Sequence, residues 1–476
     1  MASIIFHKTD TYPERFFVGT YNRSDLDAVI KAYDVRGVVG EGIDADLVGA
    51  IGAAFGHIMR SEGATRAVVG HDMRESSPEL AASFAGGAAA QGLNVTLLGL
   101  TSTDELYFAS GVKECPGAMF TASHNPAEYN GIKMCRSLAR PIGQETGLAQ
   151  IKDLLVDGIP EYTGTPGEID HEDVLQDYAA FLHGLVDIRS GRRLKVAVDA
   201  GNGMGGLTVP AVLGEDMDVA DLYFELDGNF PNHEANPLEP ANLVDLQKFT
   251  VEQGADIGIA FDGDADRCFV VDEKGNPVSP SAICALVATR YLEQNPGAAI
   301  IHNLITSHVV PEMIVENGGT PVRTRVGHSF IKAQMAEHSA VFGGEHSAHY
   351  YFKEFFNADS GMLAAMHVLA ALAEQDKPLS EFMAEYNRYE ASGEINSRLG
   401  SAEEQQAKQK EIETAFADRT ESSDWMDGLT IELADSKAWF NVRASNTEPL
   451  LRLNVEAPTR AEVDALVDEV LGIIRG

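Results

Sequence analysis

The sequence contains little positive charge. Its 476 residues include 36 lysines and arginines against 72 aspartates and glutamates, which gives a formal net charge of −36 at pH 7. Such an excess of negative charge repels the phosphates of nucleic acids and of anionic membrane surfaces. We therefore expect no nucleic-acid partner and no membrane partner. A site for an anionic small molecule would have to be a local cluster of cations, because exposed charges farther away than about 8 Å are screened at physiological salt.

Cysteine and long apolar runs are also scarce. The four cysteines, at positions 115, 135, 268 and 284, form no C-x-x-C pair and have no metal-ligand spacing, which is typical of reduced thiols in a cytosolic chain. No stretch of 18 apolar residues occurs, and residues 1–40 lack the apolar core of a signal peptide. These absences predict a cytoplasmic protein.

The remaining composition is that of a globular protein with several domains. Hydrophobic residues make up 44% of the chain, and its length corresponds to about three domains. Apolar residues recur at helical spacing over residues 47–58 and again over 243–253 and 361–372, and they alternate with short apolar runs at 67–70, 95–98, 194–199 and 298–301. This alternation predicts α/β layers.

Three weak boundaries divide the chain into four expected domains. A turn cluster lies at residues 163–167, another at 275–277, and a polar stretch at 403–410 follows Gly393. The last domain would contain strands at 429–433, 440–443 and 450–455 and then an amphipathic helix at 460–474. The expected domains are residues 1–168, 169–278, 279–393 and 394–476.

Two segments together suggest phosphoryl transfer. Ser123 lies in the run Thr121–Pro126, directly after the apolar stretch 117–120, where a strand would present a functional loop. Asp262, Asp264 and Asp266 alternate along a loop between two apolar strands, an arrangement that can hold Mg²⁺ beside a phosphorylated serine. Alone, the serine run is equally a turn or a helix cap.

A calcium loop is the alternative interpretation of the aspartates. Asp262, Asp264, Asp266 and Glu273 have the spacing of positions 1, 3, 5 and 12 of an EF-hand. The sixth position is Arg267, where the EF-hand requires glycine, and the flanking residues have the pattern of strands instead of helices. We therefore favour a site for a catalytic metal ion.

Three further segments offer groups that bind phosphate or sugar. The run 443–449 combines an arginine with hydroxyl, amide and backbone donors that suit a phosphate, although it could be only a polar turn. The run 343–349 offers a carboxylate, a hydroxyl and imidazoles that suit sugar hydroxyls. Arg36, Lys133 and His328 are additional donors, and each of them alone is an ordinary surface or capping residue.

A glycine pattern raises a different possibility. Residues 201–206 match G-x-G-x-x-G directly after a predicted strand, and Asp221 lies about 20 residues farther on, as in a dinucleotide-binding fold. Pro210 within the following stretch argues against the helix that such a fold needs. A dehydrogenase would also leave Ser123 and the aspartates unexplained.

Taken together and in this order, the segments resemble the alpha-D-phosphohexomutase family, within it the bacterial phosphomannomutase/phosphoglucomutase group. The resemblance runs from Tyr33 to Pro449 and is carried by eight motifs, at residues 33–37, 121–126, 130–133, 199–203, 262–267, 327–328, 343–349 and 443–449. It implies three similar α/β domains with mixed sheets and a smaller C-terminal α+β domain, arranged around a central cleft. It also implies a monomer or a homodimer that acts on a hexose phosphate.

The resemblance assigns a role to each candidate residue. Ser123 would be the phosphoserine, and it would ligate Mg²⁺ together with Asp262, Asp264 and Asp266. The transferring group would be surrounded by His124, Arg36, Lys133 and Arg267, with His328 near the acceptor hydroxyl; Lys133 and His328 are the candidates for proton transfer. Sugar hydroxyls would bind Glu345, Ser347 and His349, and the phosphate that is not reacting would bind Arg443, Ser445, Asn446 and Thr447.

The predicted reaction interconverts mannose 1-phosphate and mannose 6-phosphate, and glucose 1-phosphate and glucose 6-phosphate are further candidate substrates. Ser123 would pass its phosphoryl group to the sugar, and the resulting hexose 1,6-bisphosphate would turn over and return its other phosphate. A phosphoglucomutase, a phosphoglucosamine mutase and a metal-dependent sugar phosphatase remain alternatives. A phosphosugar sensor without turnover is another, although a sensor has no use for a serine paired with a metal.

Overall fold

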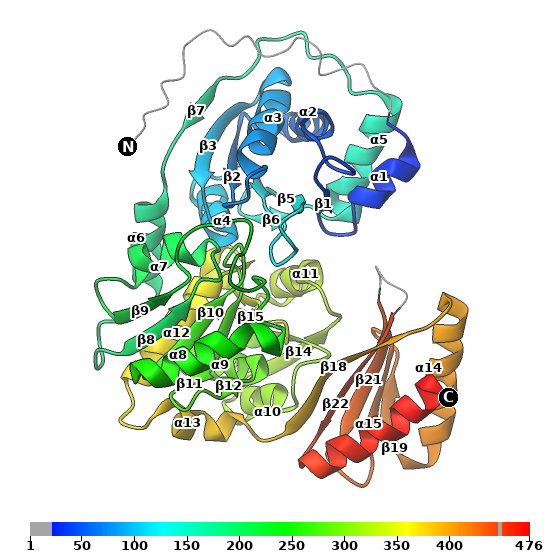
Figure 1. Cartoon of the computed structure of the whole chain (residues 1–476). Coiled ribbons are helices and arrows are strands. Elements are labelled where there is room, and N and C mark those ends of the chain that lie inside the picture. Colours follow the sequence, from blue (N-terminus) through cyan, green and yellow to red (C-terminus); the bar gives the residue numbers. More distant parts are fainter. Residues whose placement is uncertain (1–20, 446–449) are drawn as a thin grey trace. The chain divides into compact units, whose positions relative to one another are not determined.

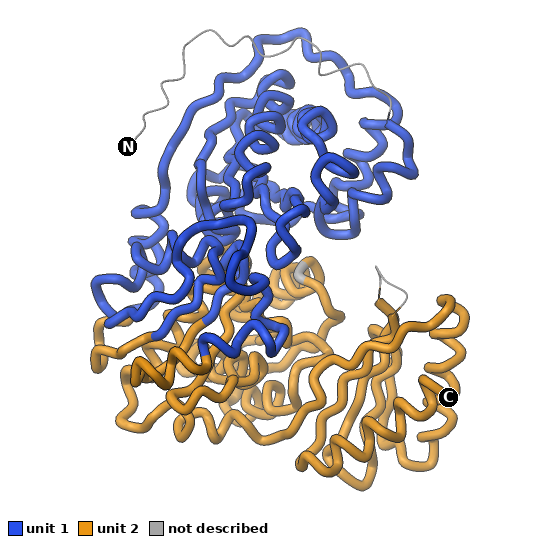
Figure 2. Tube along the Cα trace, viewed as in Figure 1, with its two compact units in different colours: residues 1–187, 197–246, 260–266 blue, residues 188–196, 247–259, 267–476 orange. Residues whose placement is uncertain are grey.

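The computed structural model describes residues 21–445 and 450–476, apart from the side chain of His328. The chain divides into two compact units (Figure 2). The first comprises residues through 187 together with 197–246 and 260–266, and the second comprises 188–196, 247–259 and 267–476. Among the described residues, none of the helices has both the length and the apolar character needed to cross a bilayer.

The first unit contains a mixed sheet of seven strands (Figure 1). In spatial order these are β1 (Val35–Val38), β5 (Tyr129–Arg136), β4 (Gly117–Phe120), β2 (Arg66–His71), β3 (Asn94–Leu100) and β7 (Ile169–His171), with β6 (Arg140–Pro141) paired to β5. The contacts of β2 with β3 and β4 are parallel, and those of β5 with β1 and β4 are antiparallel. Because β7 pairs with β3, this sheet continues just beyond residue 168.

Helices α2 and α3 lie side by side beside this sheet (Figure 1). Glycines allow their backbones to approach closely. A Cβ atom added to Gly52 would lie 2.2 Å from the Phe84 carbonyl oxygen, and a Cβ atom added to Gly87 would lie 2.0 Å from the Gly49 carbonyl oxygen, so a larger residue does not fit at either position. Among the described residues, the α-helices that lie entirely within the first unit are α1 (Arg23–Val29), α2 (Ala45–Ser61), α3 (Ser77–Ala90), α4 (Thr103–Val112), α5 (Ala149–Asp157), α6 (Leu175–Leu185) and α7 (Gly205–Val212).

The second sheet flanks the aspartate loop. Its order is β12 (Pro277–Val278), β11 (Cys268–Asp272), β10 (Ile257–Phe261), β8 (Lys195–Asp199) and β9 (Asp218–Leu222), and α8 (Val244–Gln253) precedes β10. The predicted strands on both sides of the aspartates are confirmed, which agrees with the rejection of an EF-hand. The turn at residues 275–277 lies in a hairpin, in which Gly275, at φ +83°, connects β11 to β12.

The third sheet and its helices belong to the second unit. The sheet is mixed, in the order β14 (Thr320–Thr324), β13 (Ala299–Asn303), β15 (Phe342–Gly344), β16 (Tyr350–Phe352) and β17 (Ala358–Asp359). Its helices are α9 (Pro280–Gln294), α10 (Val309–Glu316), α11 (His328–His338), α12 (Gly361–Ala373) and α13 (Leu379–Phe382). Parallel pairing joins β13 to β14 and β15, whereas β16 is antiparallel to both neighbours.

The fourth sheet is antiparallel throughout and also belongs to the second unit. Its order is β18 (Glu390–Arg398), β22 (Leu450–Ala457), β21 (Trp439–Ala444), β20 (Leu429–Leu433) and β19 (Thr420–Asp424). Helices α14 (Ala402–Phe416) and α15 (Arg460–Arg475) lie beside this sheet (Figure 1), and both contribute residues to its apolar core. The first three sheets, each with its helices, and the smaller antiparallel sheet with two helices agree with the predicted class of three α/β domains and a smaller α+β domain.

The polar stretch 403–410 lies within helix α14. Ser401 caps α14 by accepting a hydrogen bond from the Glu404 backbone N–H at 3.2 Å. Gln405, Gln409 and Ile412 then bury one face of the helix, so the polar composition conceals an amphipathic pattern. The expectation that Pro210 argues against a helix is wrong, because α7 forms with Pro210 inside it.

Candidate active site

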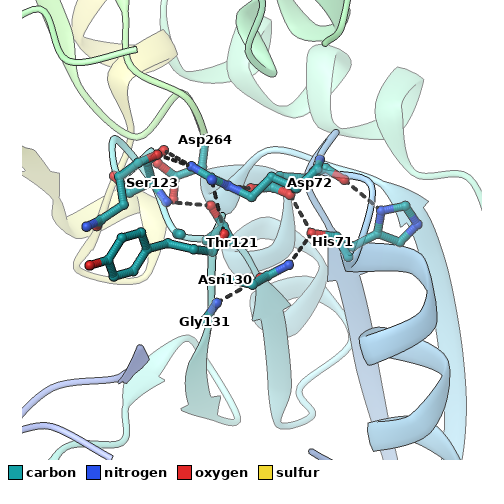
Figure 3. Close-up of polar contacts among 12 residues, drawn as sticks. His71, Asp72, Thr121, Ser123, Asn130, Gly131 and Asp264 are labelled. Atoms are coloured by element: carbon teal, nitrogen blue, oxygen red, sulfur yellow. Dashed lines mark hydrogen bonds and ion pairs between the residues drawn. The ribbon is translucent and has the colours of Figure 1, made fainter. Parts of the chain in front are cut away.

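Ser123 lies on a loop directly after β4, in the first unit. Its backbone is left-handed, at φ +50°, and its N–H donates to Thr121 Oγ1 at 2.8 Å (Figure 3). The hydroxyl donates to Asp262 Oδ2 at 2.9 Å and lies 3.2 Å from His124 Nδ1. The residue is 5% exposed. The serine hydroxyl is therefore aimed at the aspartate loop, as the sequence predicted, with only a narrow approach from solvent.

Arg74 shapes the serine loop, a role that sequence reasoning missed. Its guanidinium is buried and pairs with the Asp72 carboxylate at 3.2 Å. It also donates to four carbonyl oxygens of the loop and of the strand that follows: Ser123 at 3.0 Å, Asn125 at 2.7 Å, Pro126 at 2.7 Å and Tyr129 at 3.1 Å. The only signal in the sequence is an arginine shortly after a strand, which does not reveal these partners.

Arg36 supports the same loop from β1. Its Nη1 donates to the Ala122 carbonyl oxygen at 3.0 Å and to Asn125 Oδ1 at 2.5 Å, while Nη2 pairs with Asp34 at 2.5 Å. The guanidinium is therefore held against the residues on both sides of Ser123 and His124 in the loop, Ala122 and Asn125.

The three aspartates form a buried cluster in the first unit. Asp262, Asp264 and Asp266 are each at most 1% exposed, and one carboxylate oxygen from each lies within 4.8 Å of the others. Thr103 at the start of α4 donates to Asp264 Oδ2 at 2.6 Å. The Lys133 ammonium group contacts Asp264 at 2.7 Å and Asp266 at 2.6 Å. Residues 100 or more positions apart thus meet at one point.

The charge of this cluster favours a cation. Burial alone would lower the pKa of the Lys133 ammonium group, but Asp264 and Asp266 beside it raise that pKa well above its usual value. Three carboxylates and one ammonium group still leave a formal charge of −2 in a buried place, which is costly unless a cation compensates it. Carboxylate oxygens are the ligands that Mg²⁺ prefers. The cluster can therefore hold a divalent metal ion.

The glycine run at 201–206 packs against the aspartate loop. A Cβ atom on Gly203 would lie 2.6 Å from the Gly263 carbonyl oxygen, to which the Met204 N–H donates at 2.9 Å. Gly263 in turn approaches Ser123, because a Cβ atom there would lie 2.4 Å from the Ser123 carbonyl oxygen. The glycines therefore serve close packing at this site, and the dinucleotide interpretation is not needed to explain them.

The loop after β15 carries the candidate sugar ligands, in the second unit. Glu345 is 2% exposed, and its carboxylate accepts hydrogen bonds from Tyr351 Oη at 2.5 Å, Asn303 Nδ2 at 3.1 Å and the Gly327 N–H at 3.3 Å. Ser347 Oγ lies 3.0 Å from His349 Nδ1. The structure brings these three predicted residues together on one loop and adds Asn303 and Tyr351, which the sequence did not suggest.

The candidate phosphate ligands lie at the end of β21, also in the second unit. Arg443 pairs with Glu394 of β18 at 2.7 Å. Arg452, the cross-strand neighbour of Arg443, contacts Glu394 at 3.3 Å and donates to Ser445 Oγ at 3.3 Å. Two guanidinium groups facing one carboxylate leave a local positive charge in an acidic chain. Sequence reasoning missed Arg452. Asn446 and Thr447 lie outside the described residues.

Two predicted residues remain. Arg267 is 3% exposed and forms an isolated backbone bridge with His349. His328 is the first residue of α11, and its side chain lies outside the described part of the structure.

Four domain models match the chain in order. They are described as phosphoglucomutase/phosphomannomutase alpha/beta/alpha domains I, II and III and the C-terminal domain of the same proteins. The matches cover residues 27–157, 176–275, 279–389 and 394–473.

Whole-chain relatives agree with these matches. A phosphomannomutase of Escherichia coli K12 is 38% identical over 437 residues, which is 90% of this chain and 94% of that protein. A phosphohexose mutase of Xanthomonas campestris is 38% identical over 456 residues, covering 94% and 99%. The crystal structure of a phosphoglucomutase/phosphomannomutase family protein from Burkholderia thailandensis superposes with a TM-score of 0.85 at 32% identity, covering 95% of this chain and 97% of that one.

Proposed function

The chain belongs to the phosphoglucomutase/phosphomannomutase family, and we propose that it interconverts mannose 1-phosphate and mannose 6-phosphate through a phosphorylated Ser123. The reaction class follows from the family: the chain is a hexose phosphomutase, a phosphotransferase of the isomerase class. The observation that supports the role of Ser123 is its hydroxyl, which lies 2.9 Å from Asp262 at the edge of the buried acidic cluster.

The reaction proceeds in two transfers. In the first, the bond between the phosphorus atom and Ser123 Oγ breaks while a bond forms to O6 or O1 of the hexose monophosphate, whose hydroxyl loses its proton to a base. The product is a hexose 1,6-bisphosphate. The freed Ser123 Oγ takes up a proton. After the intermediate turns over, Ser123 Oγ loses that proton and bonds to the other phosphorus atom, while the bond from this phosphorus to the sugar oxygen breaks; the sugar oxygen takes up a proton, and the opposite monophosphate is released. Both transfers depend on in-line positioning.

Side chains around Ser123 supply charge and proton transfer in this proposal. His124, Arg36, Lys133 and Arg267 stabilise the negative charge of the transferring group, and Lys133 and His328 are the candidates for moving the proton. Asp262, Asp264 and Asp266 would hold Mg²⁺ together with an oxygen of the phosphoserine, and this ion would neutralise charge on the phosphoryl group.

Substrate binding would occupy the two sites of the second unit. Glu345, Ser347 and His349 would bind sugar hydroxyls, and Arg443, Ser445, Asn446 and Thr447 would bind the phosphate that is not reacting. The names of the relatives from Escherichia coli support mannose as the preferred sugar. Glucose and glucosamine phosphates are the alternatives to be compared in the same assay.

The test combines intact-mass measurement with assays on Ser123→Ala. We expect the wild type to gain the mass of one phosphoryl group when incubated with a hexose 1,6-bisphosphate, and Ser123→Ala to gain none and to lose mutase turnover. Ser24→Ala, at an exposed serine of α1, is the control and should behave as wild type. Steady release of free phosphate by the wild type would instead indicate a phosphatase. Normal turnover with phosphate release in Arg443→Ala would support the same conclusion.

A further inference from the structure

The carboxylate of Glu345 joins three separate elements of the second unit. Asn303 is the last residue of β13, Gly327 immediately precedes α11, and Tyr351 is the central residue of β16. All three donate to Glu345, Tyr351 to Oε1 and the other two to Oε2. A buried carboxylate that accepts three hydrogen bonds has a fixed orientation.

These bonds limit what else Glu345 can accept. A carboxylate offers about four acceptor positions on its two oxygens. Among the described residues, three donors occupy three of them, and two of the three are on Oε2. One position remains, on Oε1, beside the Tyr351 hydroxyl. A sugar that meets Glu345 in this arrangement can donate only one hydroxyl to it.

Tyr351 is itself held in place. Its side chain is fully buried. Its ring stacks on that of His349, with centroids 6.4 Å apart and planes at 24°, and the Lys332 ammonium group lies 5.8 Å from the ring centroid. Lys332 is also buried and pairs with Asp359 at 2.8 Å. With its ring confined in this way, the Tyr351 hydroxyl oxygen is held beside Glu345 Oε1.

Asn303 is oriented in a similar manner. Its Oδ1 accepts a hydrogen bond from the Ile305 N–H at 3.3 Å, which assigns the opposite end of the amide as the donor to Glu345. The side chain is fully buried. The two side-chain donors to Glu345, Tyr351 and Asn303, are thus held by contacts within the protein that do not involve a substrate.

We propose that Tyr351 and Asn303 are positioning residues, which aim the single remaining acceptor of Glu345 at one ring hydroxyl of the hexose. The proposal rests on the proposed function, because it assigns how that sugar site selects its substrate. Neither residue touches the reacting atoms. Their contribution is to binding, which is equal in the ground state and the transition state, so their loss raises KM more than it lowers kcat.

Tyr351→Phe tests this directly, and the chain provides a matched control. Tyr350 is the adjacent residue of the same strand, is equally buried, and donates instead to the Pro280 carbonyl oxygen at 3.3 Å. Both changes remove one hydroxyl from a buried tyrosine. We expect Tyr351→Phe to raise KM for mannose 1-phosphate about tenfold, as for the loss of one hydrogen bond to a charged group, with little change in kcat. Tyr350→Phe should leave KM within about twofold of wild type.

Deoxy substrates separate positioning from a general structural effect. The 2-, 3- and 4-deoxy analogues of mannose 1-phosphate are assayed with wild type, Tyr351→Phe and Tyr350→Phe. On the analogue that lacks the hydroxyl bound by Glu345, the wild type should already have the raised KM, and Tyr351→Phe should add nothing further. On the other two analogues the loss of about tenfold should persist. Asn303→Leu should show the same selectivity.

The possible outcomes distinguish the inference from the function on which it rests. An active wild type with an unaffected Tyr351→Phe, or with equal losses on all three analogues, overturns the inference and leaves the function intact. If the increase in KM caused by Tyr351→Phe disappears on two of the three analogues, Glu345 binds two hydroxyls, and the argument that only one acceptor position remains is wrong. A wild type without mutase turnover on any hexose phosphate overturns the proposed function and the inference together.

Discussion

At the scale of single residues, this site depends on side chains that have no direct chemical role. Ser123 adopts a left-handed backbone conformation that is unfavourable for a serine by about 1 kcal/mol or more. The buried Arg74 guanidinium, with four carbonyl partners on the loop and on β5, compensates this cost and holds the backbone of the loop. Its partner Asp72 is also buried, so the support remains paired and neutral overall.

Replacement of this support is therefore expected to affect both stability and rate. In Arg74→Lys the charge facing Asp72 remains, but an ammonium group has three donors and cannot reach four carbonyl oxygens and a carboxylate. We expect a loss of about 2–4 kcal/mol in the free energy of unfolding and a fall in kcat, because the Ser123 loop relaxes. Urea denaturation and steady-state assays measure the two effects.

Arg66→Lys is the control for this prediction. Arg66 lies at the start of β2 and donates to a single carbonyl oxygen, that of Lys113 at 2.7 Å. Its replacement should change stability by less than about 0.5 kcal/mol. If the two variants prove equally stable and equally active, the supporting role of Arg74 is wrong.

At the scale of elements, the contact between two loops positions the catalytic groups. The serine loop follows β4 and the aspartate loop joins β10 to β11, and they approach so closely that only glycine fits at position 263. Helix α4 completes the contact, because its first residue, Thr103, bonds to Asp264 through both its backbone N–H and its hydroxyl.

Gly263→Ala tests this close approach. The new methyl group would lie 2.4 Å from the Ser123 carbonyl oxygen, so one of the two loops must shift. A displacement of about 1 Å at a reacting group can lower a rate by about 100-fold, and we expect a fall in kcat of that order. In the control Gly184→Ala, the new methyl group meets no atom within 4 Å on α6 and should leave kcat unchanged. Normal kcat in Gly263→Ala would contradict the argument.

Helix α4 carries a pH dependence of stability. Burial raises the pKa of Glu105 to about 8, and the Asp104 carboxylate adds to this effect, although the Ser102 N–H opposes it by hydrogen bonding. An unfolded glutamate titrates near 4.3. Between these values the folded chain keeps a proton that the unfolded chain has lost, so the free energy of unfolding falls as pH rises, by up to about 1.4 kcal/mol per pH unit.

Glu105→Gln should remove this dependence. The amide oxygen still accepts from the Ser102 N–H, and the side chain has no proton to lose. We expect the variant to match wild type near about pH 4 and to become increasingly more stable up to about pH 8. Urea denaturation across this range measures it, with Glu79→Gln at an exposed position of α3 as the control. A constant difference between variant and wild type at all pH values would refute the prediction.

At the scale of the whole molecule, negative charge dominates. The net charge of −36 includes three buried carboxylates at one point, and a divalent cation that binds there binds the folded chain in preference to the unfolded one. We expect Mg²⁺ to raise the temperature of thermal unfolding, by an amount that corresponds to about 2.7 kcal/mol at 100 times its dissociation constant.

Calorimetry with and without Mg²⁺ measures this shift, with sodium chloride added to match ionic strength. Asp264→Asn should reduce the shift, whereas Asp170→Asn, at an exposed position of β7 in the same unit, should preserve it. An equal shift in all three proteins would mean that Mg²⁺ acts elsewhere on the acidic surface.

Local patterns allowed much of this protein to be predicted. Apolar runs located β10 and β11 on both sides of the aspartates, and the strands and helix of the last domain were placed to within two residues at each end. Ser123 and the three aspartates could be selected because their residue types and spacing already carry their chemistry. At residues 403–410 the composition is polar, yet these residues form part of a helix that buries Gln405 and Gln409.

The sequence by itself thus determined the elements, because helices and strands follow from interactions between near neighbours. It also determined the family and the groups capable of phosphoryl transfer, because these follow from residue types and the order of the motifs. Only the tertiary structure decided which groups meet. The Ser123 hydroxyl reaches Asp262 across 139 positions, Lys133 reaches Asp266 across 133, and Tyr351 and Asn303 converge on Glu345 from different strands. A hydrogen bond requires its two heavy atoms to lie within about 3 Å of each other. Whether residues so far apart in the sequence come this close depends on the path of the whole chain, which no local pattern specifies.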